Sequence, residues 1–513
     1  MPNMVALTSP HNDPNPAIPG FSPDPSICVI NGVFFLVTSS FHLYPGLPVY
    51  TSKDLKSWKL LGHAIHRHDQ LSLRHSDTEL PTSTSATIAT GGLWAPTIRH
   101  NEGTTYIICT NVVYKQGRTD SLRRNFIIHT TDILSNQWSD PIYFDFDGID
   151  PSLFFDDDGK TYVQVCAHPR GGIWQFEIDI KTAKPLTAPK LLWEGWDRRF
   201  TEGPHIYKKD GYYYLLVAEG GTFEDHMISI SRSNSINGPF EPCPSNPLLT
   251  AAGTNKVLHH TGHGDFFQDG NGGWWTVFLG VRRNGSRFPL GRETFLTKVD
   301  WPKNEWPSIH DPEAYSSDTA QITLKDSFEN KSFVHLRDAE ISRYRISESG
   351  LTISASPADL SSHKDTLSFA GRRQISLNGT SSVALRTSSV NVGAGSLRAG
   401  ICVYKDEHRF AALGYDFGGT QVYFEARNKA SEYSAEASDG AVTADRIYLC
   451  VCYTELEWTF QYRTVESEPW IKLGVVDTLQ LSGRDFTGPI IGMYAVGQGD
   501  AENHQVSFEE VKL

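Results

Sequence analysis

The residues from 150 to 163 read DPSLFFDDDGKTYV, a polar start followed by two apolar and aromatic runs separated by an acidic turn with glycine. Aromatic and β-branched residues favour strands, and a glycine after acidic residues supplies the positive φ that a tight turn needs. This pattern predicts a β-hairpin.

The same pattern recurs along the first 310 residues, at intervals of roughly 50 to 70 residues that are typical of propeller blades. The other copies read DPSICVINGVFFLV at 24–37, APTIRHNEGTTYII at 95–108, GPHIYKKDGYYYLL at 203–216 and, more loosely, GHGDFFQDGNGGWWTV at 262–277. Five copies predict a five-bladed β-propeller over residues 1–320. The His-, Ser- and Thr-rich segment 66–92 is expected to be a long loop between the first two blades.

The second part of the chain has shorter strands without this repeat. Examples are SSVALR at 381–386, GICVY at 400–404 and TQVYFE at 420–425. Short strands at spacings of about 8 to 12 residues are typical of a β-sandwich. We therefore expect an all-β protein in which a jelly-roll-like β-sandwich over residues 321–513 follows the propeller, with the boundary near residue 320, inside the polar segment 316–321.

Composition excludes several classes of function. The formal net charge of −13 argues against nucleic-acid binding, which requires a concentrated basic surface. No segment reaches the roughly 18 to 20 apolar residues of a membrane helix, so no membrane partner is expected. The first 19 residues lack the apolar core of a signal peptide, which predicts a cytoplasmic protein, or a secreted one if a leader precedes this sequence in nature. Seven scattered cysteines are expected to be mostly buried free thiols.

Equivalent residues of propeller repeats meet at one end of the central channel, because the first strand of each blade runs beside the axis. The residues at or next to this point in the five copies are Asp24, Trp94, Asp150, Glu202 and His263. The repeat therefore predicts a pocket with three carboxyl groups, one aromatic ring and one imidazole.

Hydrolysis of a glycosidic bond needs a proton donor for the leaving oxygen and a second carboxyl group that acts at the anomeric carbon. A third acid near the donor keeps the pKa of the donor raised. Each residue also has a simpler interpretation, since Asp-Pro is common in turns, a single Trp94 or His263 is usually a packed residue, and Arg292 could pair with a surface acid. The recurrence of acids at equivalent points favours a site. The sequence lacks the usual motifs of serine hydrolases, P-loop proteins and zinc peptidases.

These residues and their surroundings resemble glycoside hydrolase family 43, the five-bladed propeller β-xylosidases and α-L-arabinofuranosidases. The similarity is carried by PGFSPDPSI at 19–27, SKDL at 52–55, LWAP at 93–96, IDPSL at 149–153, TEGPH at 201–205, EGGT at 219–222 and GRET at 291–294. The C-terminal part is similar to the β-sandwich of the two-domain β-xylosidases in this family. The 66–92 segment departs from the compact bacterial members, so the choice of pentose does not follow from the resemblance.

The resemblance implies an inverting mechanism with Asp24 as the general base, Glu202 as the general acid and Asp150 as the residue that tunes and orients Glu202. It implies that Phe41 and Trp94 are apolar walls of the terminal-sugar subsite, and that Arg292 donates hydrogen bonds to sugar hydroxyls. It also places His263 near a water or a divalent cation such as Ca²⁺ on the propeller axis, although no cofactor is expected to be required.

The predicted activity is the exo-acting release of xylose from the non-reducing ends of β-1,4-xylo-oligosaccharides. The alternative is an α-L-arabinofuranosidase, or a bifunctional enzyme, that acts on arabinoxylan or arabinan side chains. A third hypothesis is a sugar-binding propeller without catalysis, for which three axial carboxyl groups have no purpose.

Overall fold

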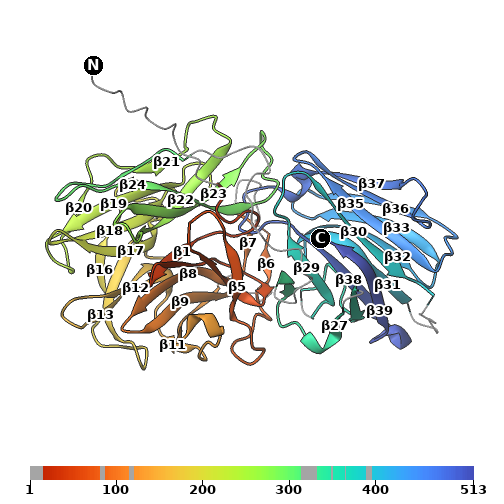
Figure 1. The fold of residues 1–513 in the computed structure, drawn as a ribbon, viewed down its shortest axis with the longest axis horizontal. Helices are drawn as coiled ribbons and strands as arrows, with labels where there is room; N and C mark the ends of the chain where they lie inside the picture. Colours follow the sequence, from red (N-terminus) through yellow and green to blue (C-terminus); the bar gives the residue numbers. More distant parts are fainter. Residues whose placement is uncertain are drawn as a thin grey trace, which may run out of the picture.

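The structure is a computed structural model that describes residues 15–80, 87–114, 121–312, 332–347, 350–363, 366–388 and 396–513. The described chain is nearly all β and forms two bodies, a propeller and a β-sandwich, which lie side by side in Figure 1. Both predicted architectures are confirmed. The predicted boundary near residue 320 lies outside the described residues.

Each blade is an antiparallel sheet that begins with one of the predicted hairpins. The first blade contains β1 (Ser26–Ile30), β2 (Val33–Val37), β4 (Gly46–Ser52) and β5 (Lys59–Ile65). The second contains β8 (Gly92–Asn101), β9 (Thr104–Val113), β10 (Leu122–Thr130) and β11 (Ile142–Phe144). The third contains β12 (Gly148–Phe155), β13 (Thr161–Ala167), β14 (Ile173–Asp179), β15 (Lys184–Pro185) and β16 (Lys190–Trp193).

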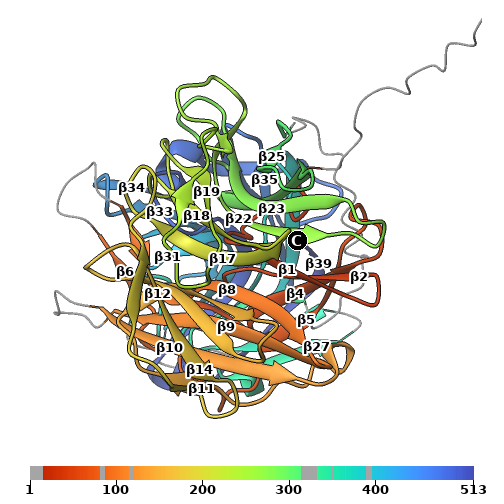
Figure 2. The ribbon, with the colours of Figure 1, turned by 90° about the vertical axis from the view of Figure 1, so that its left-hand side faces the viewer.

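The remaining blades follow the same plan. The fourth contains β17 (Glu202–Lys209), β18 (Tyr212–Glu219), β19 (Met227–Ser233), β20 (Glu241–Pro242) and β21 (Leu249–Thr250), and the fifth contains β22 (Leu258–Gln268), β23 (Trp274–Arg282), β24 (Arg292–Asp300) and β25 (Ser308–Ile309). The first strands β1, β8, β12, β17 and β22 pack against one another in order, and β22 packs back against β1 (Figure 2). The ring is also joined by Ile18, which exchanges backbone hydrogen bonds of 3.1 and 3.2 Å with Thr294 of the last blade.

The sandwich consists of two antiparallel sheets that enclose a large apolar core, which includes Trp458, Phe460 and Phe424. One sheet contains β27 (Tyr344–Ser347), β28 (Gly350–Ser354), β39 (Gln505–Lys512), β30 (Gly379–Arg386), β35 (Arg446–Tyr453), β36 (Glu457–Arg463) and β37 (Ile471–Asp477). The other contains β29 (Phe369–Arg373), β38 (Ile490–Gln498), β31 (Ser396–Asp406), β32 (Arg409–Asp416), β33 (Gln421–Asn428) and β34 (Tyr433–Asp439).

The two domains are also joined by strand pairing and by the predicted long loop. Strand β3 (Leu43–Tyr44) of the propeller pairs with β26 (His335–Leu336). The 66–92 segment contains a small hairpin of β6 (Thr78–Glu79) and β7 (Ala89–Thr90). The backbone N–H of Thr78 donates a hydrogen bond to the sandwich, and its backbone oxygen accepts one from the sandwich. All seven cysteines are free, and six of them are buried. None of the described segments forms a helix with the length and apolar character needed to cross a bilayer.

Candidate active site

A repeated backbone irregularity directs side chains towards the axis. The residues Asp24, Ala95, Asp150, Gly203 and His263 stand at equivalent points of the five blades, and each has a positive φ, between 29° and 57°. In four blades the pairing with the second strand shifts register at this point. Such a bulge re-aims the residues on either side of it. Glu202 precedes Gly203, so it occupies the position next to the equivalent point and still faces the axis.

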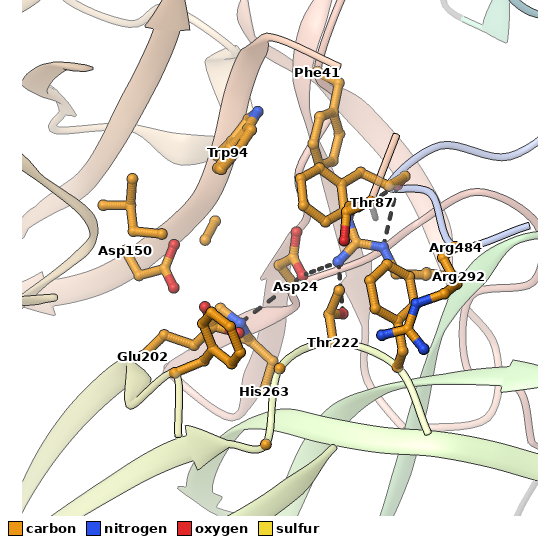
Figure 3. A pocket seen from close by; sticks show the side chains of 17 residues that line it. Asp24, Phe41, Thr87, Trp94, Asp150, Glu202, Thr222, His263, Arg292 and Arg484 are labelled. Atoms are coloured by element: carbon orange, nitrogen blue, oxygen red, sulfur yellow. Dashed lines mark hydrogen bonds and ion pairs between the residues drawn. The ribbon is translucent and has the colours of Figure 1, made fainter. Parts of the chain in front are cut away.

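The three predicted acids line one cavity of about 450 Å³ (Figure 3). Asp24 is buried, and its Oδ2 accepts a hydrogen bond of 2.6 Å from Ser39 while its Oδ1 lies 3.1 Å from Nη1 of Arg292. The backbone N–H of Gly203, the residue after Glu202, donates a hydrogen bond of 3.1 Å to Oδ2 of Asp150. Asp24 is therefore held by charged and hydroxyl donors, whereas Asp150 is tied to the strand that carries Glu202.

The environment shifts the titration of two of these acids. Burial, followed by the nearby Asp150 and Asp24 carboxyl groups, raises the pKa of Glu202 well above its usual value, and Arg292 only partly opposes this. Burial also raises the pKa of Asp150 to about 6, with His263 lowering it and Asp24 raising it. Desolvation and like charge disfavour the ionised form of a carboxyl group. Burial and the neighbouring carboxyl groups therefore favour the protonated form of Glu202, which is the form that a proton donor requires.

Aromatic side chains form one wall of the cavity. Phe41 and Trp94 both line it, with ring centroids 5.8 Å apart. Phe486 of the sandwich completes this wall, with its ring 5.1 Å from that of Trp94 and 6.0 Å from that of Phe41. Apolar faces of this kind suit the C–H faces of a sugar ring.

Arg292 and His263 also line the pocket. Arg292 contacts Asp24, donates 3.1 Å to Oγ1 of Thr222, and donates 3.1 and 2.9 Å from Nε and Nη2 to the backbone oxygen of Phe486. Nδ1 of His263 lies 3.9 Å from Oδ1 of Asp24. The surface ion-pair interpretation of Arg292 is thus wrong, because the side chain is buried beside Asp24.

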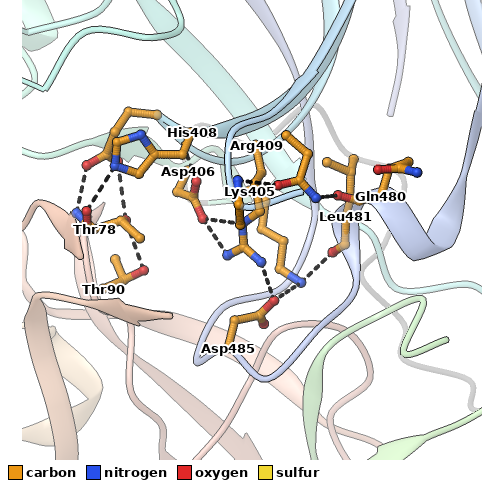
Figure 4. Close-up of polar contacts among 12 residues, drawn as sticks. Thr78, Thr90, Lys405, Asp406, His408, Arg409, Gln480, Leu481 and Asp485 are labelled. Atoms are coloured by element: carbon orange, nitrogen blue, oxygen red, sulfur yellow. Dashed lines mark hydrogen bonds and ion pairs between the residues drawn. The ribbon is translucent and has the colours of Figure 1, made fainter. Parts of the chain in front are cut away.

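The loop that carries Phe486 is fixed by a buried ionic cluster in the sandwich, shown in Figure 4. Asp485 lies 2.8 Å from Nζ of Lys405 and 2.5 Å from Nη1 of Arg409, and the same arginine contacts Asp406. The loop also reaches the propeller, since the backbone oxygen of Arg484 accepts 2.9 Å from the N–H of Ile88. The sandwich therefore supplies part of the pocket in a fixed position.

All seven predicted site residues line this one cavity, and the sequence did not point to several others that do. These are Thr87, Phe200, Gly220, Gly221, Thr222, Phe223, Arg484 and Phe486, together with Ser39 behind Asp24. Thr222 belongs to the EGGT motif, which could have identified it. Phe486 and Arg484 had no such signal, because they lie outside the propeller repeat.

The described residues do not provide a protein cage for a metal ion. Among them, no three His, Cys, Asp or Glu side chains are grouped as metal ligands, and the carboxyl group paired with His263 is that of Asp24. Ca²⁺ prefers six to eight oxygen ligands. The donor set at His263 does not match this preference, so no catalytic step is assigned to a metal.

Comparison with known proteins agrees with this geometry. The family described as glycosyl hydrolases family 43 matches residues 14–307, and the beta xylosidase C-terminal concanavalin A-like domain matches residues 325–513. The chain is 32% identical to the non-reducing end alpha-L-arabinofuranosidase BoGH43B of Bacteroides ovatus, over 96% of this chain and 93% of the relative. It is 36% identical to a beta-xylosidase of Bacillus subtilis, over 58% of this chain and 56% of the relative.

A solved structure of the same kind is that of the GH43 BlXynB protein from Bacillus licheniformis. It superposes with a TM-score of 0.82 at 28% identity, over 97% of this chain and 98% of that chain. The family matches and the superposition thus cover both the propeller and the appended sandwich. With its propeller and its sandwich both matched, the chain belongs to glycoside hydrolase family 43 and is a glycoside hydrolase.

Proposed function

We propose that the protein is an exo-acting, inverting β-xylosidase that releases xylose from the non-reducing ends of β-1,4-xylo-oligosaccharides. The observation that carries this proposal is the shape of the site, in which three axial acids lie in a cavity walled by Phe41, Trp94 and the sandwich residue Phe486. A loop from a second domain across the pocket suits a chain end. An enzyme that cuts within a chain needs an open groove.

In the proposed mechanism, Glu202 donates its proton to the glycosidic oxygen as the bond breaks. Asp24 takes a proton from the water that attacks the anomeric carbon from the opposite side, so the configuration inverts. Asp150 favours the protonated form of Glu202, because its own charge raises the pKa of Glu202. Arg292 orients Asp24 and can donate to sugar hydroxyls from the same position. Hydrolysis by these groups requires no cofactor.

The second candidate is an α-L-arabinofuranosidase, or an enzyme with both activities. It is favoured by the similarity along nearly the whole chain to an arabinofuranosidase of Bacteroides ovatus, which includes the sandwich that lines the pocket. The substrate is then an arabinoxylan or arabinan side chain. Xylopyranose and arabinofuranose can present similar hydroxyl groups to one site.

The test is product analysis on xylobiose, arabinoxylan and branched arabinan side by side. Xylose from xylobiose alone supports the first proposal. Arabinose from arabinoxylan or arabinan supports the second, as a single activity if xylobiose gives no xylose and as a bifunctional enzyme if it does. On longer xylo-oligosaccharides, exo action gives monosaccharide from the earliest time. A ladder of intermediate lengths contradicts exo action, and the absence of any released pentose contradicts both proposals.

A further inference from the structure

An exposed aromatic ring stands at the rim of the pocket, beside the proposed general acid. Phe200 lines the cavity, yet 74% of its surface is exposed. It precedes Glu202 by two residues, at the end of the loop that joins β16 to β17. Single exposed apolar residues are common on protein surfaces. This one differs because it forms part of the wall of a sugar-sized cavity.

The loop that carries Phe200 is held in place by the buried carboxyl group of Glu219. Glu219, at the end of β18, is fully buried. It accepts hydrogen bonds from the backbone N–H groups of Trp196 at 3.2 Å, Asp197 at 2.9 Å and Arg198 at 3.0 Å, and from the hydroxyl groups of Thr201 and Ser229. Gly220 adds a backbone hydrogen bond of 2.7 Å to Arg199. The ring is thus exposed on a backbone that is held in place.

The backbone of this loop also adopts an unfavourable conformation at the aromatic residue. Phe200 has a φ of 50°, in the left-handed region that bulky side chains rarely occupy. Such strain persists where surrounding contacts hold it, and it is concentrated at ligand sites. The neighbour of the ring across the rim is Gly221, where even an added Cβ would lie 3.4 Å from the ring. No side chain of Gly221 therefore covers the ring.

We propose that Phe200 is the platform for the sugar that leaves, so that it forms the first subsite beyond the scissile bond; this rests on the proposed glycosidase function. The general acid must reach the glycosidic oxygen, so the leaving sugar lies next to Glu202. Phe200, two residues before Glu202 in the chain, is an aromatic residue that lines the same cavity. The ligand is a pyranose ring, whose C–H face packs on the aromatic face. Glu219 is the positioning residue that holds the platform.

The test compares a leaving group that is a sugar with one that is not. The probes are xylobiose and β-D-xylopyranosyl fluoride, which share the xylosyl unit but lose xylose and fluoride respectively. Phe200→Ala is expected to lower kcat/KM on xylobiose about tenfold more than on the fluoride, which corresponds to about 1.4 kcal/mol. Phe200→Trp keeps an aromatic face, so its ratio of kcat/KM on xylobiose to kcat/KM on the fluoride is expected to stay close to that of the wild type. Because Phe200 is mostly exposed, its truncation removes little packing.

Trp196→Ala is the matched control, since Trp196 lies on the same loop and is 41% exposed but does not line the cavity. It is expected to leave both rates within about twofold, as surface substitutions usually do. Equal losses of Phe200→Ala on the two probes, or no loss, would overturn the subsite while leaving the glycosidase function intact. Wild-type protein that acts on neither probe would instead contradict the proposed xylosidase function, and the subsite with it.

Discussion

Nη1 of Arg292 lies 3.1 Å from Oδ1 of Asp24, so the proposed general base is paired with a buried cation from the last blade. The other nitrogens of the same guanidinium donate to the backbone oxygen of Phe486, in the sandwich. A bidentate, planar donor can fix two partners at once. The position of Asp24 therefore depends on how both domains meet at Arg292.

Replacement of the acid and of the base should have different dependence on the leaving group. A general acid matters most for a poor leaving group, because an alkoxide must be protonated as it departs, whereas a nitrophenolate leaves unaided. Glu202→Ala should lose most activity on xylobiose and retain much more on a nitrophenyl xyloside. Asp24→Ala should lose roughly 10² to 10⁴-fold on both, because water must be deprotonated whatever leaves. Steady-state kinetics of both variants on the two substrates measure these losses of activity. If both variants lose the same factor on xylobiose as on the nitrophenyl xyloside, the roles of acid and base are wrongly assigned.

Replacement of Asp150 should shift the pH dependence of activity. Its carboxyl group raises the pKa of Glu202, so the neutral amide of Asp150→Asn lets Glu202 lose its proton at a lower pH. The alkaline limb of kcat/KM against pH is then expected to move to lower pH, with a fall in kcat of up to about 10²-fold. Full pH profiles of the wild type and the variant measure this. An alkaline limb that stays in place would remove Asp150 from the tuning of Glu202.

Removal of the aromatic ring of Phe486 should weaken substrate binding, although Phe486 belongs to the sandwich and the three acids belong to the propeller. Phe486→Ala leaves the backbone oxygen available to Arg292 but opens the wall beside Trp94 and Phe41. KM is expected to rise roughly tenfold, in line with the loss of one well-packed aromatic contact. Leu479→Ala, on an exposed residue of the same domain, is the control. A KM unchanged by Phe486→Ala would mean that the sandwich does not form part of the sugar subsite.

The Asp265–Arg99 ion pair in the propeller should contribute more to the free energy of unfolding than an ion pair at the surface. Asp265 is fully buried and bonded to Arg99 at 2.8 and 3.0 Å, whereas Asp69 pairs with Arg67 at the surface, at 3.6 Å. Asp265→Ala leaves the largely buried guanidinium of Arg99 without its carboxylate partner and is expected to lower the free energy of unfolding by about 3 kcal/mol. Asp69→Ala is expected to cost at most about 1 kcal/mol. Urea unfolding followed by tryptophan fluorescence compares the two, and similar midpoints would contradict the prediction.

The contribution of Asp265 should also depend on pH. Burial alone would raise the pKa of Asp265, but Arg99 and other donors outweigh this and hold it well below its usual 3.8. A carboxyl group whose pKa is lowered on folding stabilises the protein above its unfolded pKa, and this stabilisation is lost as the pH falls. The difference between wild type and Asp265→Ala should therefore shrink below about pH 4.

Much of the site could be predicted because the fold repeats. Asp24, Asp150 and His263 recur at equivalent points of their blades, so the geometry of the ring alone brings them together, and Glu202 is displaced by one residue yet reaches the same cavity. Phe486 and Arg484 could not be predicted, because their place depends on how the sandwich packs against the propeller and on the buried Lys405–Asp485 pair. Phe200 was missed because a strained loop, rather than a repeated strand, presents it at the rim.

The position of Phe486 has a consequence for the order in which the enzyme becomes active during its synthesis. Domains generally fold as units, with the N-terminal one first as the chain emerges from the ribosome. The propeller holds all three acids within its first 202 residues, but the pocket gains its last wall only when residue 486 of 513 has been made and docked. A nascent propeller thus carries the acids in a pocket that still lacks the wall formed by Phe486.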